Sequence, residues 1–419
     1  MRPANQFISA VVIAVLASTF RIHAQELIAT GAPAQNWVGL ASSADGSKLL
    51  GAGSYGWIYS STNSGATWSP ATTAQVGQEP QRPWTAVASS ADGLTVVAVA
   101  NFQPIFISTN GGGSWQQTGP SGDWAALAIS SAGTSITAAD AVGGVYTSKD
   151  SGASWTATTA PNRRWRSLAC SGHGKTIFAG SDFGTNYGEL PAIYVSSNAG
   201  ASWIRTSAPG QPWQTLACSA DGSKAIAGAY GGLVYFTEDS GATWTQTVLP
   251  ARRWGGVACS SDGGRLIAAA WEGEVEISSD FGRTWNPAKA PAGPWLPVAS
   301  SADGIHLFAG IWDATSGGIY AATLRPVLHI EPSNNGTVVS WAGPATGYVL
   351  QQSSDMTSAN WQPVTAATSI LAGQNRVLVG VGQPVSAYRL VRAGSPQLVT
   401  GRAAISGPRT VEEIAPAGF

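Results

Sequence analysis

The sequence predicts an all-β protein, a seven-bladed β-propeller closed by an N-terminal strand and followed by a small β-sandwich. The first observation is a phrase, Trp-x-x-Leu/Val-Ala, that recurs seven times with spacings of 47, 40, 41, 48, 41 and 41 residues. That period is the length of four short strands with their turns, the unit of a propeller blade. The phrases begin at Trp37, Trp84, Trp124, Trp165, Trp213, Trp254 and Trp295.

Repeat five shows the expected blade most plainly. Residues 213 to 218 alternate as a strand, residues 220 to 222 (Ala-Asp-Gly) form a turn, and residues 224 to 229 return. Residues 233 to 237 form a third strand, and a fourth begins at Thr243-Trp244 and ends before Pro250. Strands of about five or six residues are typical of globular sheets.

The second observation is a motif in the third turn, Ser/Thr-x-Asp/Asn-x-Gly-x-Thr/Ser-Trp, which occurs six times. The Asp or Asn oxygen can accept from backbone amides, and the glycine can take a positive φ. The tryptophan then packs the hairpin onto its neighbour. The Asp and Asn positions are Asn63, Asn110, Asp150, Asn198, Asp239 and Asp280.

This pattern resembles the Asp-box, or BNR, repeat of the sialidase-like superfamily. The seven-fold arrangement over residues 26 to 323 is most similar to the photosystem II assembly and stability factor type of propeller. The resemblance implies that the boxes are fold-stabilising hairpins away from the active face. It implies architecture and no catalysis.

The third observation concerns the two ends of the repeat region. Repeat seven lacks a box, whereas residues 27 to 33 line up with residues 155 to 161, the fourth strand of repeat three. We therefore expect the N-terminal strand to complete the last blade and remove an open sheet edge. The expected domains are a propeller over 25–324, a β-sandwich over 325–396 and a flexible tail over 397–419. The sandwich resembles a C-terminal module of exported bacterial proteins.

Residues 1–24 combine Arg2 with an apolar stretch and read as a signal peptide. We therefore expect a protein that is secreted, periplasmic or on a bacterial cell surface, with no membrane span after signal removal; the alternative is that residues 1–24 remain as an uncleaved anchor. Charged residues are 11% of the chain and the formal net charge is −1, which excludes a nucleic-acid partner. Cys170, Cys218 and Cys259 replace small residues of other repeats, so no metal and no cofactor is expected, and we expect a monomer.

Strand order places the strand 2–3 loops and the 4–1 connectors on one face, which we take as the binding face. The two lengthened segments, Ala71 to Pro83 and Ser181 to Pro191, both belong to it. Loops on a rigid scaffold commonly carry recognition. The candidate residues are Tyr55, Arg82, Phe102, Arg163, Arg164, Asp182, Phe183, Tyr187, Tyr230, Arg252, Arg253, Trp271, Glu272 and Trp312. A structural alternative is that the arginines stack on the repeat tryptophans.

These residues favour an exported, non-catalytic binding or assembly scaffold that recognises a protein or a carbohydrate. The alternative is a secreted glycoside hydrolase of the sialidase-like class, for which Glu272 with Asp313 or Asp182 are the candidate carboxylates. The arginine triad and the Arg-Ile-Pro phrase of sialidases do not fit this chain. A third hypothesis, an assembly factor for a membrane complex, comes from the photosystem II resemblance.

Overall fold

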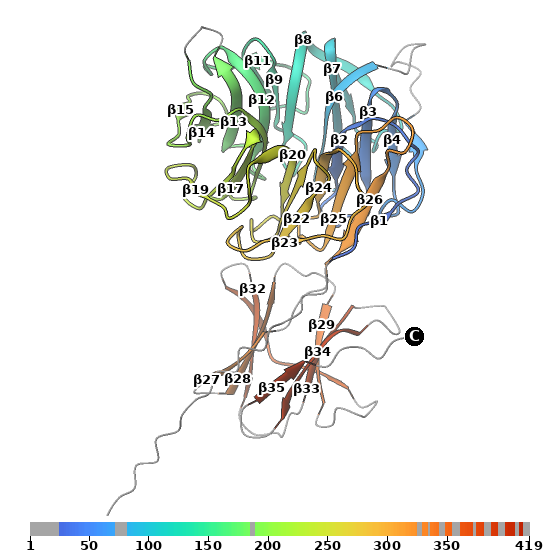
Figure 1. Ribbon diagram of the computed structural model, residues 1–419, viewed down its shortest axis with the longest axis vertical. Coiled ribbons are helices and arrows are strands. Elements are labelled where there is room, and N and C mark those ends of the chain that lie inside the picture. Colours follow the sequence, from blue (N-terminus) through green and yellow to red (C-terminus); the bar gives the residue numbers. More distant parts are fainter. Residues whose placement is uncertain are drawn as a thin grey trace, which may run out of the picture.

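The computed structural model describes residues 25–71, 82–184, 189–324, 329–333, 336–342, 348–353, 361–371, 374–380, 387–392, 399–406 and 410–413. All named elements in these ranges are β-strands (Figure 1). None of the described residues forms a helix with the length and apolarity that crossing a membrane requires. The expected signal peptide, Tyr187, and most of the connector from Ala71 to Pro83 lie outside the described residues.

Each repeat tryptophan lies in the first strand of an antiparallel unit. The first strands are β2 (Trp37–Ser42), β6 (Arg82–Ser89), β8 (Gln116–Ile129), β12 (Arg163–Cys170), β16 (Trp213–Cys218), β20 (Arg252–Cys259) and β24 (Trp295–Ser300). The second strands are β3 (Leu49–Gly56), β7 (Val96–Ser108), β9 (Ile136–Asp140), β13 (Ile177–Gly184), β17 (Ala225–Gly232), β21 (Leu266–Ala270) and β25 (His306–Ile311). We number the repeat units one to seven in this order.

The outer two strands of the units are shorter. The third strands are β4 (Ile58–Ser61), β10 (Val145–Ser148), β14 (Ile193–Ser196), β18 (Val234–Thr237), β22 (Val275–Ser278) and β26 (Ile319–Thr323). The fourth strands are β5 (Ser69–Pro70), β11 (Thr156–Ala157), β15 (Ile204–Arg205), β19 (Thr245–Gln246), β23 (Asn286–Pro287) and β1 (Ile28–Ala29). In unit two, β7 also supplies the third strand and β8 the fourth, because pairs such as Asn101 with Asp123 extend the ladder through the loop.

The units form a closed ring. Their first strands lie next to each other in the order β2, β6, β8, β12, β16, β20, β24 and back to β2. Backbone hydrogen bonds join the strand 1–2 turns of successive units, and the chain of bonds returns to its start. The donors and acceptors are Ala44 to Ala91, Ala91 to Ser131, Ser131 to Gly172, Gly172 to Ala220, Ala220 to Ser261, Ser261 to Ala302, and Ala302 to Ala44.

The predicted closure by the N-terminal strand is confirmed. β1 pairs with β26 in antiparallel register, with Ile28 opposite Ala321 and Ala29 opposite Tyr320. The hydroxyl of Thr30 donates to the carbonyl of Ile319 at 2.7 Å, which extends the seam beyond the short strand. The outer edge of β26 is therefore paired rather than open.

The repeat tryptophans form the inner core, and all seven are almost fully buried. Several meet an aromatic side chain of the third strand edge to face, the arrangement that the ring quadrupoles favour. Trp124 and Tyr146 have ring centroids 5.5 Å apart, and Trp295 and Tyr320 lie 5.2 Å apart. The tryptophan repeat is thus a packing device that fixes each unit against its own outer strands.

The boxes are hairpins tied to the strand 1–2 turn of their own unit. In box three, Asp150 Oδ1 accepts from the hydroxyl of Ser148 and the amide of Ser154, both at 2.8 Å. The amide of the following Ser151 then donates to the carbonyl of Thr134 at 3.0 Å. The boxes and the strand 1–2 turns therefore share one rim, which we call the box face.

Beyond residue 328 the strands form two antiparallel sheets. One contains β27 (His329–Ser333), β28 (Gly336–Ala342), β32 (Gln374–Gly380) and β31 (Thr368–Leu371). The other contains β30 (Gln362–Pro363), β29 (Tyr348–Ser353), β33 (Ala387–Arg392), β34 (Val399–Ser406) and β35 (Thr410–Glu413). Buried residues from both sheets share one core, and Ile305, from the turn of unit seven, is 3% exposed within it.

The structure differs from the flexible tail expected over 397–419. β34 (Val399–Ser406) pairs with β33, and β35 (Thr410–Glu413) pairs with β34. The sequence does carry a hairpin signal here. β-branched residues, among them Val399, Ile405 and Val411, flank a Gly-Pro pair. Since Ile305 belongs to the box face, the C-terminal sheets pack on that side of the ring (Figure 1).

Candidate functional site

The strand 2–3 loops and the 4–1 connectors meet on the rim opposite the boxes, which we call the loop face. Backbone hydrogen bonds join the two segments within each unit. The amide of Tyr230 donates to the carbonyl of Pro212 at 2.9 Å, and the amide of Trp271 donates to the carbonyl of Arg253 at 2.9 Å. Each loop is therefore held at a fixed place beside the start of its first strand.

Large apolar side chains are exposed on the loop face. Tyr55 is 73% exposed, Phe102 is 75% exposed and Tyr230 is 49% exposed, and Trp57 from the same loop as Tyr55 is also exposed. Val142 and Leu190 add apolar surface in units three and four. Exposed apolar residues that gather on one face are characteristic of interaction sites.

Tyr55 and Phe102 also have left-handed backbone conformations, with φ of 51° and 58°. In unit five the corresponding residue is Gly231, with φ of 73°, and nothing lies within 4 Å of the Cβ it would gain. A bulky residue in this region costs roughly 1–2 kcal/mol that a glycine avoids. Two aromatic residues are therefore kept where glycine would suit the fold better.

Two of the candidate arginines have partly structural roles. The guanidinium of Arg82 lies 4.9 Å from the ring centroid of Phe106, and that of buried Arg163 lies 5.2 Å from the ring of Tyr194. Both rings belong to the third strands of their units, so Arg82 and Arg163 stack on third-strand rings, whereas the sequence predicted stacking on the repeat tryptophans. Arg163 also pairs with Glu189 at 3.2 Å.

The remaining arginines form ion pairs across the loop face. Arg252 Nη1 lies 2.8 Å from Glu274, and Arg253 Nε lies 2.7 Å from Glu272. Arg164 Nη2 lies 3.6 Å from the carboxylate of Asp182. Trp271 and Trp312 lie together, with ring centroids 6.0 Å apart. Phe183 lies in β13, at the edge of the described residues.

The three carboxylates considered for glycoside hydrolysis are each engaged in other bonds. Partial burial would raise the pKa of Glu272, but hydrogen bonds from Arg253 outweigh it and lower that pKa. The hydroxyl of Ser316 and the amide of Thr315 hold the pKa of Asp313 well below its usual range. Asp182 accepts from Arg166 at 2.7 Å. A general acid needs a raised pKa, so these surroundings do not favour the glycosidase alternative.

One carboxylate pair on the loop face was not singled out from the sequence. The amide of Asp123 donates to Asp140 Oδ2 at 3.2 Å, which brings the two side chains together. Burial and the nearby charge of Asp140 raise the pKa of Asp123, while Arg166 opposes the shift. The signal available in the sequence was that Asp123 directly precedes a repeat tryptophan, in the position that Arg164 and Arg253 occupy in other units.

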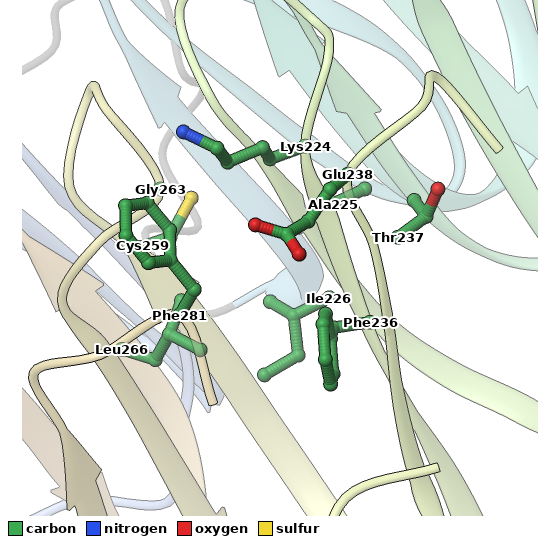
Figure 2. A pocket seen from close by; sticks show the side chains of 10 residues that line it. All are labelled: Lys224, Ala225, Ile226, Phe236, Thr237, Glu238, Cys259, Gly263, Leu266 and Phe281. Carbon is green, nitrogen blue, oxygen red and sulfur yellow. The ribbon is translucent and has the colours of Figure 1, made fainter. Parts of the chain in front are cut away.

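A small pocket, with room for about one water molecule, lies on the other rim, between units five and six. Lys224 and Glu238 stand at one end of it, and Ile226, Phe236 and Leu266 at the other (Figure 2). Phe281 also lines the pocket, and its ring centroid lies 4.2 Å from Lys224 Nζ. This pocket belongs to the packing of the boxes and not to the loop face.

Cys170, Cys218 and Cys259 are free thiols. Burial raises the pKa of Cys170 and of Cys259 to about 12, and burial together with the other two thiols raises the pKa of Cys218 well above its usual value. Within the described residues no group of three or more His, Cys, Asp or Glu side chains has an arrangement that would hold a metal ion.

Comparison with known proteins identifies the fold. No protein-family model matches the chain, and no curated protein matches it. Among solved structures, it is similar to YCF48 bound to a D1 peptide, with 19% identity and a TM-score of 0.53, over 71% of this chain and 96% of that one. It is also similar to YCF48 from Cyanidioschyzon merolae, with 14% identity and a TM-score of 0.53, over 72% and 98% of the two chains. At these identities the likeness shows the fold alone, and the fold is a β-propeller.

Proposed function

We propose that this chain is an exported, non-catalytic scaffold that binds a protein partner on its loop face. The observation that carries the proposal is the set of exposed aromatic side chains on that face, above all Tyr55 and Phe102 in left-handed conformations. Residues in unfavourable backbone conformations cluster at functional sites, because the fold itself gains no stability from keeping them there. Tyrosine, tryptophan and arginine, which the loop face combines, dominate the energetics of protein interfaces.

Two further observations support a protein partner. The C-terminal sheets pack on the box face through Ile305, which leaves the loop face uncovered by them. The structurally similar YCF48 is described as bound to a D1 peptide, so a propeller of this fold has held a peptide. Export rests on the signal-like residues 1–24, in which Arg2 precedes an apolar stretch.

Site-specific photo-crosslinking in the source cells tests the proposal. A photoreactive phenylalanine analogue placed at Phe102 is expected to crosslink to a discrete protein. The matched control is Leu94, which belongs to the same unit, is 44% exposed and lies on the box face. Equal crosslinking at both positions, or no protein adduct at Phe102, would overturn the proposal.

A further inference from the structure

Five aromatic side chains, three exposed and two half-buried, form one arc of the loop face. They come from four neighbouring units, because the first strands β20, β24, β2 and β6 lie side by side in that order. Trp271 and Trp312 are in contact within this arc, and Tyr55, Trp57 and Phe102 are exposed along the rest of it. We call these five residues the aromatic arc.

A charged arc follows it directly around the ring, in units three and four, and Asp123 is the ladder partner of Asn101 beside Phe102. Its residues are Asp123, Asp140, Arg164, Arg166 and Asp182, carried by β8, β9, β12 and β13. Arg164 and Arg166 both approach Asp182, at 3.6 and 2.7 Å. Three carboxylates against two guanidinium groups leave an excess of one negative charge. The excess falls on Asp123 and Asp140.

Asp123 and Asp140, which carry the excess negative charge, differ in the groups that they already bind. Asp140 accepts from the backbone amides of Asp123 at 3.2 Å and Val142 at 2.9 Å, so it shapes its own loop. Asp123 is partly buried beside it and forms no ion pair within 4 Å among the described residues. Two neighbouring carboxylates repel each other, and a cation placed beside them would relieve the repulsion.

We propose that the occupant of the loop face is an extended segment of the partner protein, with apolar side chains on the aromatic arc and a basic side chain beside Asp123. The inference rests on the proposed function and specifies its ligand. An extended chain suits the aromatic arc because four successive units each contribute one or two rings, exposed in units one and two and half-buried in units six and seven, which a linear segment can contact in turn. Lysine or arginine suits the other end, because a cation complements the excess charge and forms charge-assisted hydrogen bonds with a carboxylate.

Fluorescence anisotropy of the full chain with labelled synthetic peptides tests this inference. The probes are about twelve residues long and share an apolar half, and their other half is basic, acidic or uncharged. The basic peptide is expected to bind at least tenfold more tightly than the acidic one at about 50 mM salt, and the difference should shrink at about 500 mM. Tighter binding of the acidic peptide, or no binding of any peptide, would overturn the inference.

Variants then assign the two halves of the peptide. Phe102→Ala is expected to weaken the basic peptide about tenfold at both salt concentrations, because it removes apolar contact. Asp123→Asn should weaken it about tenfold only at low salt, and the matched control Glu238→Gln, which removes a carboxylate from the box face, should leave it unchanged. An unaltered affinity in Asp123→Asn contradicts the inference. Crosslinking at Phe102 without a preference for basic peptides would leave the proposed function standing and this inference wrong.

Discussion

The backbone amide of Ala302 donates to the carbonyl oxygen of Ala44 at 2.7 Å. These residues occupy the same position in the strand 1–2 turns of the last and the first repeat, and their bond completes the series that runs around the box face. A second connection closes the same seam further out, where β1 pairs with β26. Together the two connections make the last unit equivalent to the others. Each unit is therefore bonded to a neighbour on both sides.

The acid stability of the fold should depend on three boxes. Hydrogen bonds from Ser154 lower the pKa of Asp150 to about 2, and bonds from Thr243 and Thr284 likewise lower the pKa of Asp239 and Asp280. A lowered pKa contributes stability above the unfolded value near 3.9, and this stability is lost as the pH falls through the folded value. We expect acid unfolding to begin below about pH 4.

The other boxes provide the control for that prediction, because they carry Asn63, Asn110 and Asn198 in the same place. The triple variant Asp150→Asn, Asp239→Asn and Asp280→Asn should fold and show a shallower loss of stability between about pH 4 and pH 2. Urea unfolding at each pH measures the slope. An unchanged slope would show that the box carboxylates do not govern it.

Relief of backbone strain on the loop face should stabilise the protein. Phe102→Gly removes a left-handed aromatic residue, and we expect the free energy of unfolding to stay level or rise by up to about 1 kcal/mol. Gly231→Ala makes the reverse change where the added Cβ meets nothing within 4 Å, so its loss of about 1 kcal/mol reflects the backbone alone. Chemical denaturation compares them. A marked destabilisation by Phe102→Gly would mean that the ring serves the fold.

The three thiols should be unreactive in the folded protein. Their raised pKa values keep Cys170, Cys218 and Cys259 protonated at neutral pH, and the thiolate is the reactive form. A chromogenic disulfide reagent at about pH 8 should release little colour from the native chain and three equivalents after denaturation. Rapid reaction of one thiol in the native state would assign it a role other than packing.

The sequence predicted the ring well because its signals are local and repeated. A tryptophan at a fixed place in each repeat must be buried, and the box chemistry determines one hairpin at a time. The alignment of residues 27 to 33 with a fourth strand was sufficient to predict the seam. The hairpin of β34 and β35 was missed because isolated charges were given more weight than its β-branched residues.

The candidate site was less predictable because it depends on contacts between units. Strand order predicted which aromatic residues lie on the loop face. No feature of the sequence marks the left-handed conformations of Tyr55 and Phe102, because aromatic residues also occupy ordinary strand positions throughout the chain. The pairing of Asp123 with Asp140 joins residues from two strands, and no spacing rule marks it. The ring partners of Arg82 and Arg163 likewise lie on other strands of the sheet.

The ring closes through β1 and β26, and an engineered disulfide across that seam tests this closure most directly. Ile28 and Ala321 are 293 residues apart in sequence and opposite each other in the ladder, and Cα atoms in such pairs lie about 4.5–5.5 Å apart, within the range of a disulfide. Ile28→Cys combined with Ala321→Cys should oxidise to an intramolecular disulfide, detected by mass spectrometry of the digest, while Ile28→Cys alone should remain a free thiol. Reduced cysteines in the double variant under oxidising conditions, with the fold intact, would contradict the closure.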